Sequence, residues 1–276
     1  MDIPKLGLWT WKIDNTQIET IISLAYDIGY RFFDTAWIYG NEAWVWNALK
    51  SLWKDRGSYW LTTKVWFDYV PDYQKHDFVV QDFMYSNLEK RLVDSFNDLK
   101  TDYFDLVLLH WPTNFNNDAY AFEKLLKYKR EGRILHLWVS NFPTDVMKKM
   151  VSYFWNEVEF NQFERHAFLS NDSLEIYLKE NNIQMMAYSP LWHQHLLKNS
   201  ELVKIANEYS ISVPQLCLAY LLKKGFIVIP KASSIEHLKD NYSSLDIELS
   251  DEIIKKVDSL PKNYRYINPP FAPERN

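Results

Sequence analysis

The segment RFFDTAWIYGNE, residues 31–42, decides the fold. Its apolar first half predicts a short buried strand that ends at Asp34, and a helix is predicted directly after it, over about Glu42–Leu52. Tyr39 and Gly40 lie in the short loop between them. A short apolar strand followed by an amphipathic helix is the repeating unit of a parallel sheet wrapped by helices.

The same unit recurs on both sides of this segment. Strands are predicted at residues 7–11, 31–34, 59–65, 104–110, 134–140, 158–162, 183–189 and 226–230. Helices are predicted at about 15–28, 42–52, 79–99, 120–130, 145–153, 173–181, 201–224 (a helical pair) and 236–242, with a last helix at 250–259 outside the repeat. Eight strands and eight crossovers predict one α/β domain over residues 1–276, a (β/α)8 TIM barrel with an N-terminal strand segment and an extra C-terminal helix.

The composition is that of an ordinary globular protein, with 47% hydrophobic and 24% charged residues among 276. The net charge of −5 argues against a nucleic-acid partner, because such proteins concentrate Lys and Arg. No apolar stretch approaches the roughly 18 residues of a membrane helix, and the N-terminus lacks a signal-peptide pattern. Cys217 is the single cysteine, so no disulfide framework exists. We therefore expect a cytoplasmic protein without a membrane partner, and a monomer by default.

Polar side chains stand where the predicted strands end. They are Asp34, Lys64, His110, Ser140 with Asn141, Asn161 with Gln162, Tyr188 with Ser189, and Lys231. In a (β/α)8 barrel these strand ends meet at one mouth, where barrel active sites lie. Any one of them could be an ordinary loop start, but seven together predict a functional site.

One kind of chemistry is suited by three of these strand-end residues together with a tyrosine from the loop after the second strand. The four residues are Asp34, Lys64, His110 and Tyr39. A lysine cation beside a phenol favours the phenolate and is expected to lower the pKa of Tyr39. Asp34 would keep Lys64 charged in a half-buried site, and His110 would hydrogen-bond and orient a substrate oxygen. This arrangement suits protonation of a developing alkoxide, and the hydride has to come from a nicotinamide cofactor.

Seven segments in this order resemble the motif series of the aldo-keto reductases. They are RFFDTAWIYGNE, WLTTKVW, LVLLHWP, VSNF, NQFERH, AYSPL and IPKASS. The C-terminal YINPPFAPERN is similar to bacterial members such as the 2,5-diketo-D-gluconate reductases. The resemblance covers essentially the whole chain.

The resemblance implies a role for each matching position. Tyr39 would give its proton to the carbonyl oxygen, Lys64 and Asp34 would tune it, and His110 would position the carbonyl. Ser140, Asn141 and Gln162 would hold the nicotinamide carboxamide, Tyr188 would stack on its ring, and Ser189 and Leu191 would follow the pyrophosphate. Trp11, Trp66 and Trp111 would wall the substrate pocket.

The cofactor implied by the resemblance is NADPH. Lys231 matches the lysine that meets the 2′-phosphate, and Asp240 and Asn241 match residues near the adenine. Ala232 replaces a frequent serine and His237 a frequent arginine, so the charge that holds this phosphate is weakened. NADPH is expected as cofactor, with NADH possible. No metal is expected, because His166, His193 and His195 lack companion ligands at a recognised spacing.

Glycine is scarce and tryptophan abundant: the chain has 6 glycines and 12 tryptophans, where glycine alone usually supplies about 7% of residues. Trp9, Trp46, Trp138 and Trp192 stand where the family pattern has glycine, and Trp53 and Trp155 are less secure cases. Indoles at such positions are expected to overpack the barrel by roughly 1–3 kcal/mol each. Compensating changes, a degenerate chain and a glycine codon translated as tryptophan are the three explanations, and we favour the last.

Three functions are compatible with a barrel of this kind. NADPH-dependent reduction of small aldehydes or ketones is favoured over a regulatory or partner-binding barrel of the same family that binds cofactor without turnover. A phosphate-binding isomerase barrel fits the strand count but lacks a glutamate base and glycine-rich phosphate loops. The sequence does not choose among carbonyl substrates, because specificity depends on loops around Trp66, Trp111 and Phe271.

Overall fold

The computed structural model describes residues 2–66, 68–72, 77–82, 87–191, 196–269 and 272. Eight parallel strands form one sheet, in which each strand is hydrogen-bonded to the one that follows it along the chain. The strands are β1 (Leu8–Trp9), β2 (Phe32–Asp34), β3 (Trp60–Val65), β6 (Phe104–Leu109), β7 (Ile134–Ser140), β8 (Phe160–Glu164), β9 (Gln184–Tyr188) and β10 (Phe226–Ile229). The predicted (β/α)8 barrel is confirmed.

The N-terminal segment closes the barrel against β10. The amide of Gly7 donates to the carbonyl of Val228 (2.9 Å), and the amide of Trp9 donates to that of Pro230 (3.2 Å). A Cβ on Gly7 would lie 2.5 Å from the ring of Phe32, so only glycine lets the segment approach this closely.

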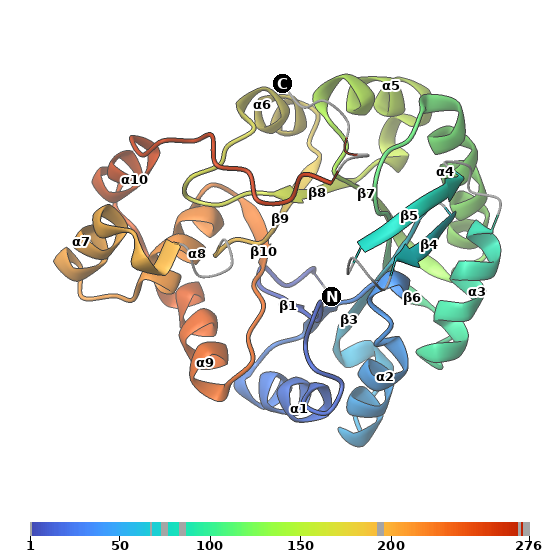
Figure 1. Ribbon diagram of the computed structural model, residues 1–276, viewed down its shortest axis with the longest axis horizontal. Coiled ribbons are helices and arrows are strands. Elements are labelled where there is room, and N and C mark those ends of the chain that lie inside the picture. The colour runs from blue at the N-terminus through green and yellow to red at the C-terminus, as the bar shows by residue number, and fades with distance from the viewer. Residues whose placement is uncertain are drawn as a thin grey trace.

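Helices surround the strands (Figure 1). They are α1 (Ile18–Ile28), α2 (Glu42–Ser51), α3 (Leu88–Asp98), α4 (Phe115–Arg130), α5 (Thr144–Phe154), α6 (Asp172–Glu180), α7 (Ser200–Glu208), α8 (Val213–Lys223), α9 (Ile235–Ser243) and α10 (Asp251–Asp258). Several begin at the expected capping residues: the Ser234 and Ser250 hydroxyls accept backbone amides at the starts of α9 and α10. The extra C-terminal helix is α10. Among the described residues, no helix combines the length and apolar character needed to cross a membrane.

Most strand residues are buried on both faces, one toward the helices and one toward the barrel interior. On β6 all six side chains are buried, with Leu106 and Leu108 in the interior cluster and Val107 and Leu109 in the outer one. This explains why the strands are continuous apolar runs rather than alternating patterns.

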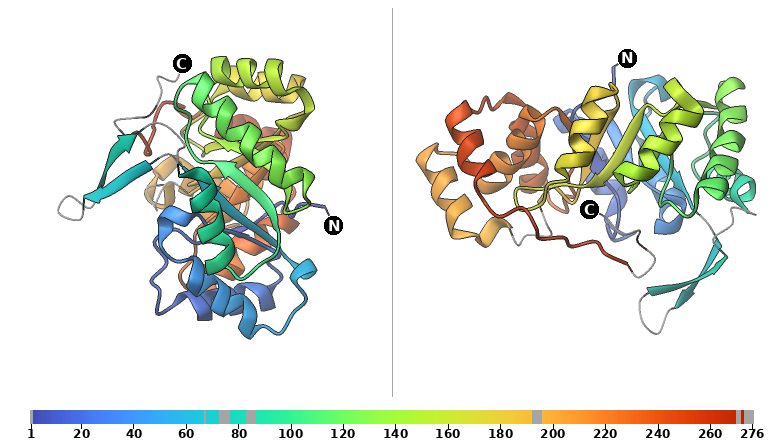
Figure 2. Two further views of the ribbon diagram at one scale, coloured as in Figure 1. Left: turned by 90° about the vertical axis from the view of Figure 1, so that its right-hand side faces the viewer. Right: turned by 90° about the horizontal axis from the view of Figure 1, so that it is seen from above.

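The helix predicted over residues 79–99 is wrong in its first half. Residues Asp68–Asp72 (β4) and Asp77–Asp82 (β5) form an antiparallel hairpin, and α3 begins only at Leu88. The pair Val79–Val80 favours a strand, and its partner strand precedes it by a short turn that periodicity alone does not reveal. Figure 2 (right) shows this hairpin and the chain after α10 on one side of the barrel, opposite the N-terminus.

Two of the suspected glycine positions have backbone geometry that suits glycine. Trp155 ends α5 with φ 50° and ψ −122°, a combination that side chains rarely adopt. Trp53, just after α2, has φ 53°. Trp155 is 71% exposed and Trp53 is 93% exposed, so packing offsets little of the strain. Glycine is the usual residue with positive φ at helix ends.

Trp138 and Trp46 sit differently. Trp138 lies on β7 inside the barrel, fully buried, with its ring stacked on Phe160 at a centroid distance of 3.6 Å. Its indole nitrogen has no hydrogen-bond partner among the described residues, and an unsatisfied buried donor costs about 1–3 kcal/mol. Trp46 on α2 is partly buried against the core. Trp192 lies outside the described residues.

We expect Trp155→Gly and Trp53→Gly each to raise the free energy of unfolding by about 1 kcal/mol, because the strain of a positive φ is removed. Urea denaturation measures this. Trp44→Gly is the matched control: Trp44 is exposed inside α2, where glycine should cost about 1 kcal/mol. A loss of stability in all three variants would contradict a glycine-like backbone at residues 53 and 155.

Candidate active site

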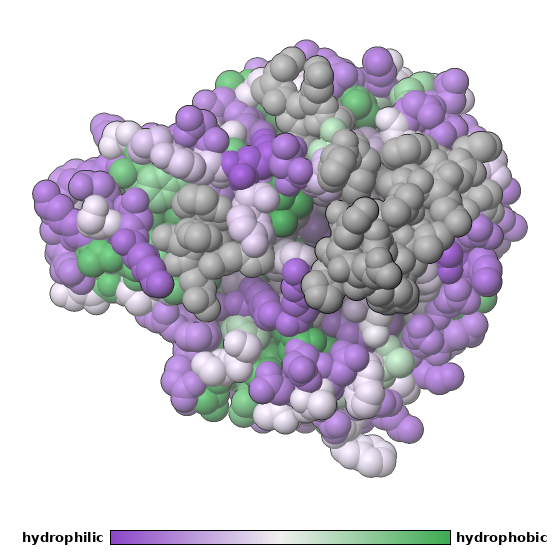
Figure 3. Space-filling model, in the orientation of Figure 1, coloured by the Kyte–Doolittle hydropathy of each residue, from purple (hydrophilic) through white to green (hydrophobic). Residues whose placement is uncertain are grey.

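A cavity of about 460 Å³, the mouth pocket, opens where the strands end. A hollow is visible near the centre of this face in the space-filling view (Figure 3). Its walls come from seven strand ends or loops and from the chain after α10: Trp9, Trp11, Lys12, Ile38, Tyr39, Trp66, His110, Trp111, Asn141, Gln162, Tyr188 and residues 266–269. Tyr39, His110 and the three tryptophans expected at the substrate are thus brought together.

A buried ion pair lies behind Tyr39. The Lys64 ammonium on β3 contacts the Asp34 carboxylate at the end of β2, and both side chains are fully buried. The same ammonium donates to the Thr35 carbonyl (2.9 Å). Burial lowers the pKa of Lys64 and raises the pKa of Asp34, and each partner opposes the shift of the other. Two buried charges are stable here only because each is paired.

Tyr39 lies on a short 3-10 helix, η1 (Trp37–Tyr39), in front of this pair. Its hydroxyl oxygen accepts hydrogen bonds from Lys64 Nζ (3.2 Å) and from Trp9 Nε1 (2.9 Å). The expected contact between phenol and ammonium is therefore present. Neither bond uses the hydroxyl hydrogen, which can be donated to a group in the mouth pocket.

The expected direction of the Tyr39 pKa is wrong for this structure. Burial raises the pKa of Tyr39 well above its ordinary value, and the negative charge of Asp34 raises it further, while the bond from Trp9 lowers it. Because Asp34 neutralises Lys64, the ammonium cannot offset the loss of solvent. Tyr39 is accordingly a protonated phenol at neutral pH, the state that a proton donor requires.

His110 directly follows β6 and lies beside Tyr39, with the two ring centroids 6.1 Å apart. Burial lowers the pKa of His110 well below its usual value, and the positive charge of Lys64 lowers it further. The imidazole is thus neutral and able to donate one hydrogen bond. Its Nδ1 has no partner among the described residues.

Asn141 links the ends of β6, β7 and β9. Its amide nitrogen donates to the His110 carbonyl and the Ser140 hydroxyl (3.0 Å each), and its oxygen accepts from the Tyr188 hydroxyl (2.7 Å). Ser140 is fully buried beneath it and lines neither pocket. The Gln162 backbone carbonyl accepts the Asn141 backbone amide (2.8 Å), and the Gln162 side chain donates to Asp34 Oδ2 (3.1 Å), which connects this network to the ion pair.

Two predicted cofactor residues have strained backbones. Asn141 has φ 66° and Ser189 has φ 49°, values that non-glycine residues adopt sparingly and often at functional sites. The buried Ser189 hydroxyl has no partner among the described residues. Ser189 directly follows β9 and lines a second cavity.

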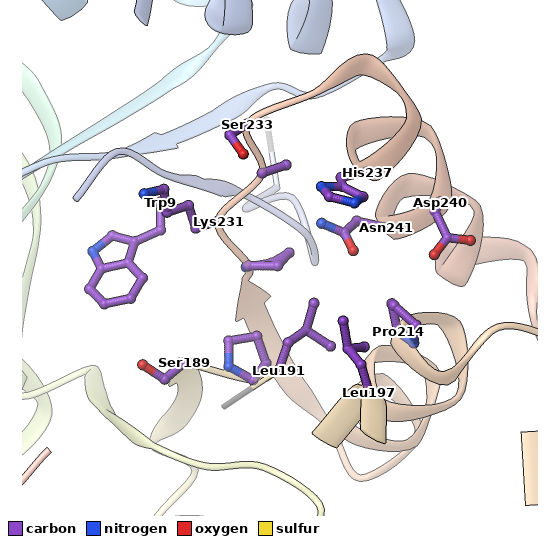
Figure 4. Close-up of a pocket in the computed structure, with 13 residues that line it drawn as sticks. Trp9, Ser189, Leu191, Leu197, Pro214, Lys231, Ser233, His237, Asp240 and Asn241 are labelled. Atoms are coloured by element: carbon purple, nitrogen blue, oxygen red, sulfur yellow. The ribbon is translucent and has the colours of Figure 1, made fainter. Parts of the chain in front are cut away.

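This second cavity, the side pocket, measures about 240 Å³ and extends from Trp9 to α9 (Figure 4). It contains the remaining predicted cofactor residues: Ser189, Leu191, Lys231, Ala232, His237, Asp240 and Asn241. In Figure 4, His237 and Asn241 lie on the α9 side of the pocket and Lys231 lies beside Trp9. The carboxylate of Asp240 is engaged by the Ser212 hydroxyl (2.8 Å).

Lys231 is held near a second cation. Its ammonium donates to the backbone carbonyl of Lys12, and burial together with the charge of Lys12 lowers its pKa. An anion bound between the two lysines would relieve this repulsion.

Two features of the mouth pocket were not predicted. The first is Trp9, whose indole lies in the pocket although the sequence marked it only as a replaced glycine. The second is the anchor of the C-terminal segment: the buried Glu164 carboxylate accepts the amides of Tyr266 (2.8 Å) and Ile267 (2.9 Å). No local sequence pattern indicates either feature. Trp9 contacts Tyr39, thirty residues away, and Glu164 contacts a segment about a hundred residues away.

The histidines considered for a metal are not brought together in the described part of the chain. His166 lies 3.5 Å from the Glu164 carboxylate, fully buried, whereas His193 and His195 fall outside the described residues. No group of three potential metal ligands occurs among the described residues. The absence of a metal stays a prediction.

Because of Glu42, we expect the free energy of unfolding to depend on pH. Glu42 is buried beside Lys64, and burial raises its pKa from 4.5 to about 7, although hydroxyls of Thr63 (2.6 Å) and Ser95 (2.7 Å) donate to it. Between these pH values the folded chain binds more protons than the unfolded chain, so stability should fall as pH rises from about 5 to above 7, by roughly 3 kcal/mol. In Glu42→Gln this part of the slope should disappear from denaturation curves recorded across that range.

Asp118 on α4 is the matched control, because burial also raises its pKa to about 7. Asp118→Asn should remove only its own share of the slope, and the double variant should remove both. An unchanged slope in Glu42→Gln would show that Glu42 ionises normally in the folded chain.

Comparisons with known proteins agree with this geometry. The chain is 30% identical to methylglyoxal reductase DkgB of Escherichia coli O157:H7, over 99% of each chain, and 32% identical to a glyoxal reductase of Bacillus subtilis, over 96% of this chain and 91% of that one. The crystal structure of a putative 2,5-diketo-D-gluconic acid reductase B superposes with a TM-score of 0.90 at 27% identity, covering 99% of this chain and 94% of that one. Residues 5–262 match the aldo/keto reductase family model, and the chain belongs to this family of oxidoreductases.

Proposed function

We propose that this chain reduces small aldehydes and ketones to alcohols with NADPH, and that Tyr39 is the general acid. The observation that carries the proposal is the contact of the Tyr39 phenol with the Lys64 ammonium (3.2 Å) at the wall of the mouth pocket. A protonated phenol can pass its proton to a developing alkoxide, and the ammonium that donates to its oxygen holds the phenol in position and limits the cost of the phenolate left behind, although it does not cancel the effect of burial.

His110 and the tryptophans complete the substrate side. A neutral His110 donates a hydrogen bond to the same carbonyl oxygen and holds it near the Tyr39 hydroxyl. Trp11, Trp66 and Trp111 form the apolar walls of a pocket that suits a small carbonyl compound. The names of the relatives support α-dicarbonyl compounds such as methylglyoxal and glyoxal as first substrates to test.

The described residues fit the two ends of a nicotinamide dinucleotide. Asn141 and Gln162, with Ser140 beneath them, offer the amides and the hydroxyl that a carboxamide needs, and the Tyr188 ring offers a stacking surface. Bound there, the cofactor supplies the hydride. The unpartnered hydroxyl of Ser189, next to Leu191, suits a pyrophosphate oxygen.

The side pocket fits the adenosine end of the dinucleotide. The Lys231 ammonium, near the charge of Lys12, suits the 2′-phosphate, and the first turn of α9 at His237 presents the positive end of a helix dipole there. Ala232, Asp240 and Asn241 would border the adenosine. These features favour NADPH over NADH.

Tyr39→Phe should lower kcat/KM for methylglyoxal by about 10²–10⁴-fold relative to its parent chain, because the proton donor is lost. NADPH affinity should change little. Consumption of NADPH and calorimetric titration measure the two quantities. The control is Tyr153→Phe, an exposed tyrosine on α5, which should leave both unchanged. Undiminished turnover in Tyr39→Phe would eliminate Tyr39 as the acid.

Lys231→Met should weaken NADPH binding by about tenfold or more, because a charge-assisted contact worth about 1.5–3 kcal/mol is lost, and should leave NADH binding unchanged. His237→Arg should have the opposite effect on NADPH. Lys239→Met is the control, an exposed lysine on α9 that lines neither pocket. Equal losses for NADPH and NADH would show that Lys231 does not meet the 2′-phosphate.

A further inference from the structure

We propose that the indole of Trp9 obstructs the dinucleotide site between its two ends, and that glycine at position 9 opens it. The inference rests on the proposed function, because a nicotinamide dinucleotide has to extend from the mouth pocket to the side pocket.

Trp9 lies on the boundary of the two cavities. Of the residues that the structure describes, it alone lines both the mouth pocket and the side pocket. In Figure 4 its indole stands at one end of the side pocket, facing away from His237, Asp240 and Asn241. A ligand with groups in both cavities has to pass through the volume that this ring occupies.

The indole is fixed in that volume by contacts on several sides. Its Nε1 donates to the Tyr39 hydroxyl (2.9 Å), and its ring stacks on Trp11 with centroids 4.9 Å apart. The Tyr188 ring lies 6.0 Å away at 37°, and only 7% of Trp9 is exposed. Trp9 therefore occupies the space between the proposed acid and the proposed stacking surface, where a nicotinamide ring would have to lie.

The backbone at position 9 does not need the indole. Trp9 has no positive φ, its amide donates to the Pro230 carbonyl (3.2 Å), and it pairs with Asp34 in the register of β1 and β2. These bonds close the barrel and involve main-chain atoms. A glycine can make all of them, and the space left by the indole would join the two cavities.

The experiment compares the chain with Trp9→Gly. Calorimetric titration with NADPH should give a Kd at least about tenfold lower for the variant, and kcat/KM for methylglyoxal should rise by a similar factor. The matched control is Trp53→Gly, the same change at a 93% exposed residue, which should leave Kd unchanged. Thermal unfolding checks that each protein is folded. Trp9→Ala replaces the variant if Trp9→Gly does not fold.

The outcomes separate this inference from the proposed function. Equal or weaker NADPH binding by the folded Trp9 variants would overturn the inference, because the indole would then be neutral or part of the site. Tighter binding that is accompanied by no turnover across a panel of carbonyls would support the inference and reject the reductase function. Tighter binding with turnover that Tyr39→Phe abolishes in the Trp9→Gly background would support both.

Discussion

The buried pair of Lys64 and Asp34 is the interaction on which the site depends. Two charges with no exposed surface are stable only when each finds its partner and further hydrogen bonds; here the Thr35 carbonyl and the Gln162 amide supply these. The parallel register of β2 and β3 sets the pair, since Asp34 lies opposite Thr62, two residues before Lys64. The same ammonium reaches the Tyr39 hydroxyl. The barrel therefore positions the Tyr39 phenol through the buried Lys64 ammonium, which strand register holds in place.

The rest of the site is held by the loops that leave the strands. Asn141 and Ser189 turn the chain with positive φ, and Asn141 connects His110 with Tyr188 through its side chain. Strained residues persist where the surroundings determine them fully. Asn141 lines the mouth pocket and Ser189 lines the side pocket. The strained Trp53 and Trp155, in contrast, lie at exposed helix ends.

The sequence predicted most of the barrel because its strands are apolar runs that end in polar residues, and strands of one parallel barrel end at one mouth. It missed the hairpin of β4 and β5, because periodicity does not show which segments pair. The direction predicted for the pKa of Tyr39 was wrong, because the balance between Lys64 and burial depends on solvent exclusion, which is a property of the folded chain. The sequence identified Trp9 as unusual but could not place the indole against Tyr39. The roles of the site residues stay predictions.

The anchor of the C-terminal segment has a consequence for evolution. Glu164 at the end of β8 holds residues 266 and 267 by their backbone amides, so the attachment is independent of which side chains those residues carry. The wall that this segment adds to the mouth pocket can therefore change its chemistry from one descendant to another while its path over the barrel stays the same. With this backbone anchor, substitutions at residues 266 and 267 can alter the substrate pocket without altering the fold.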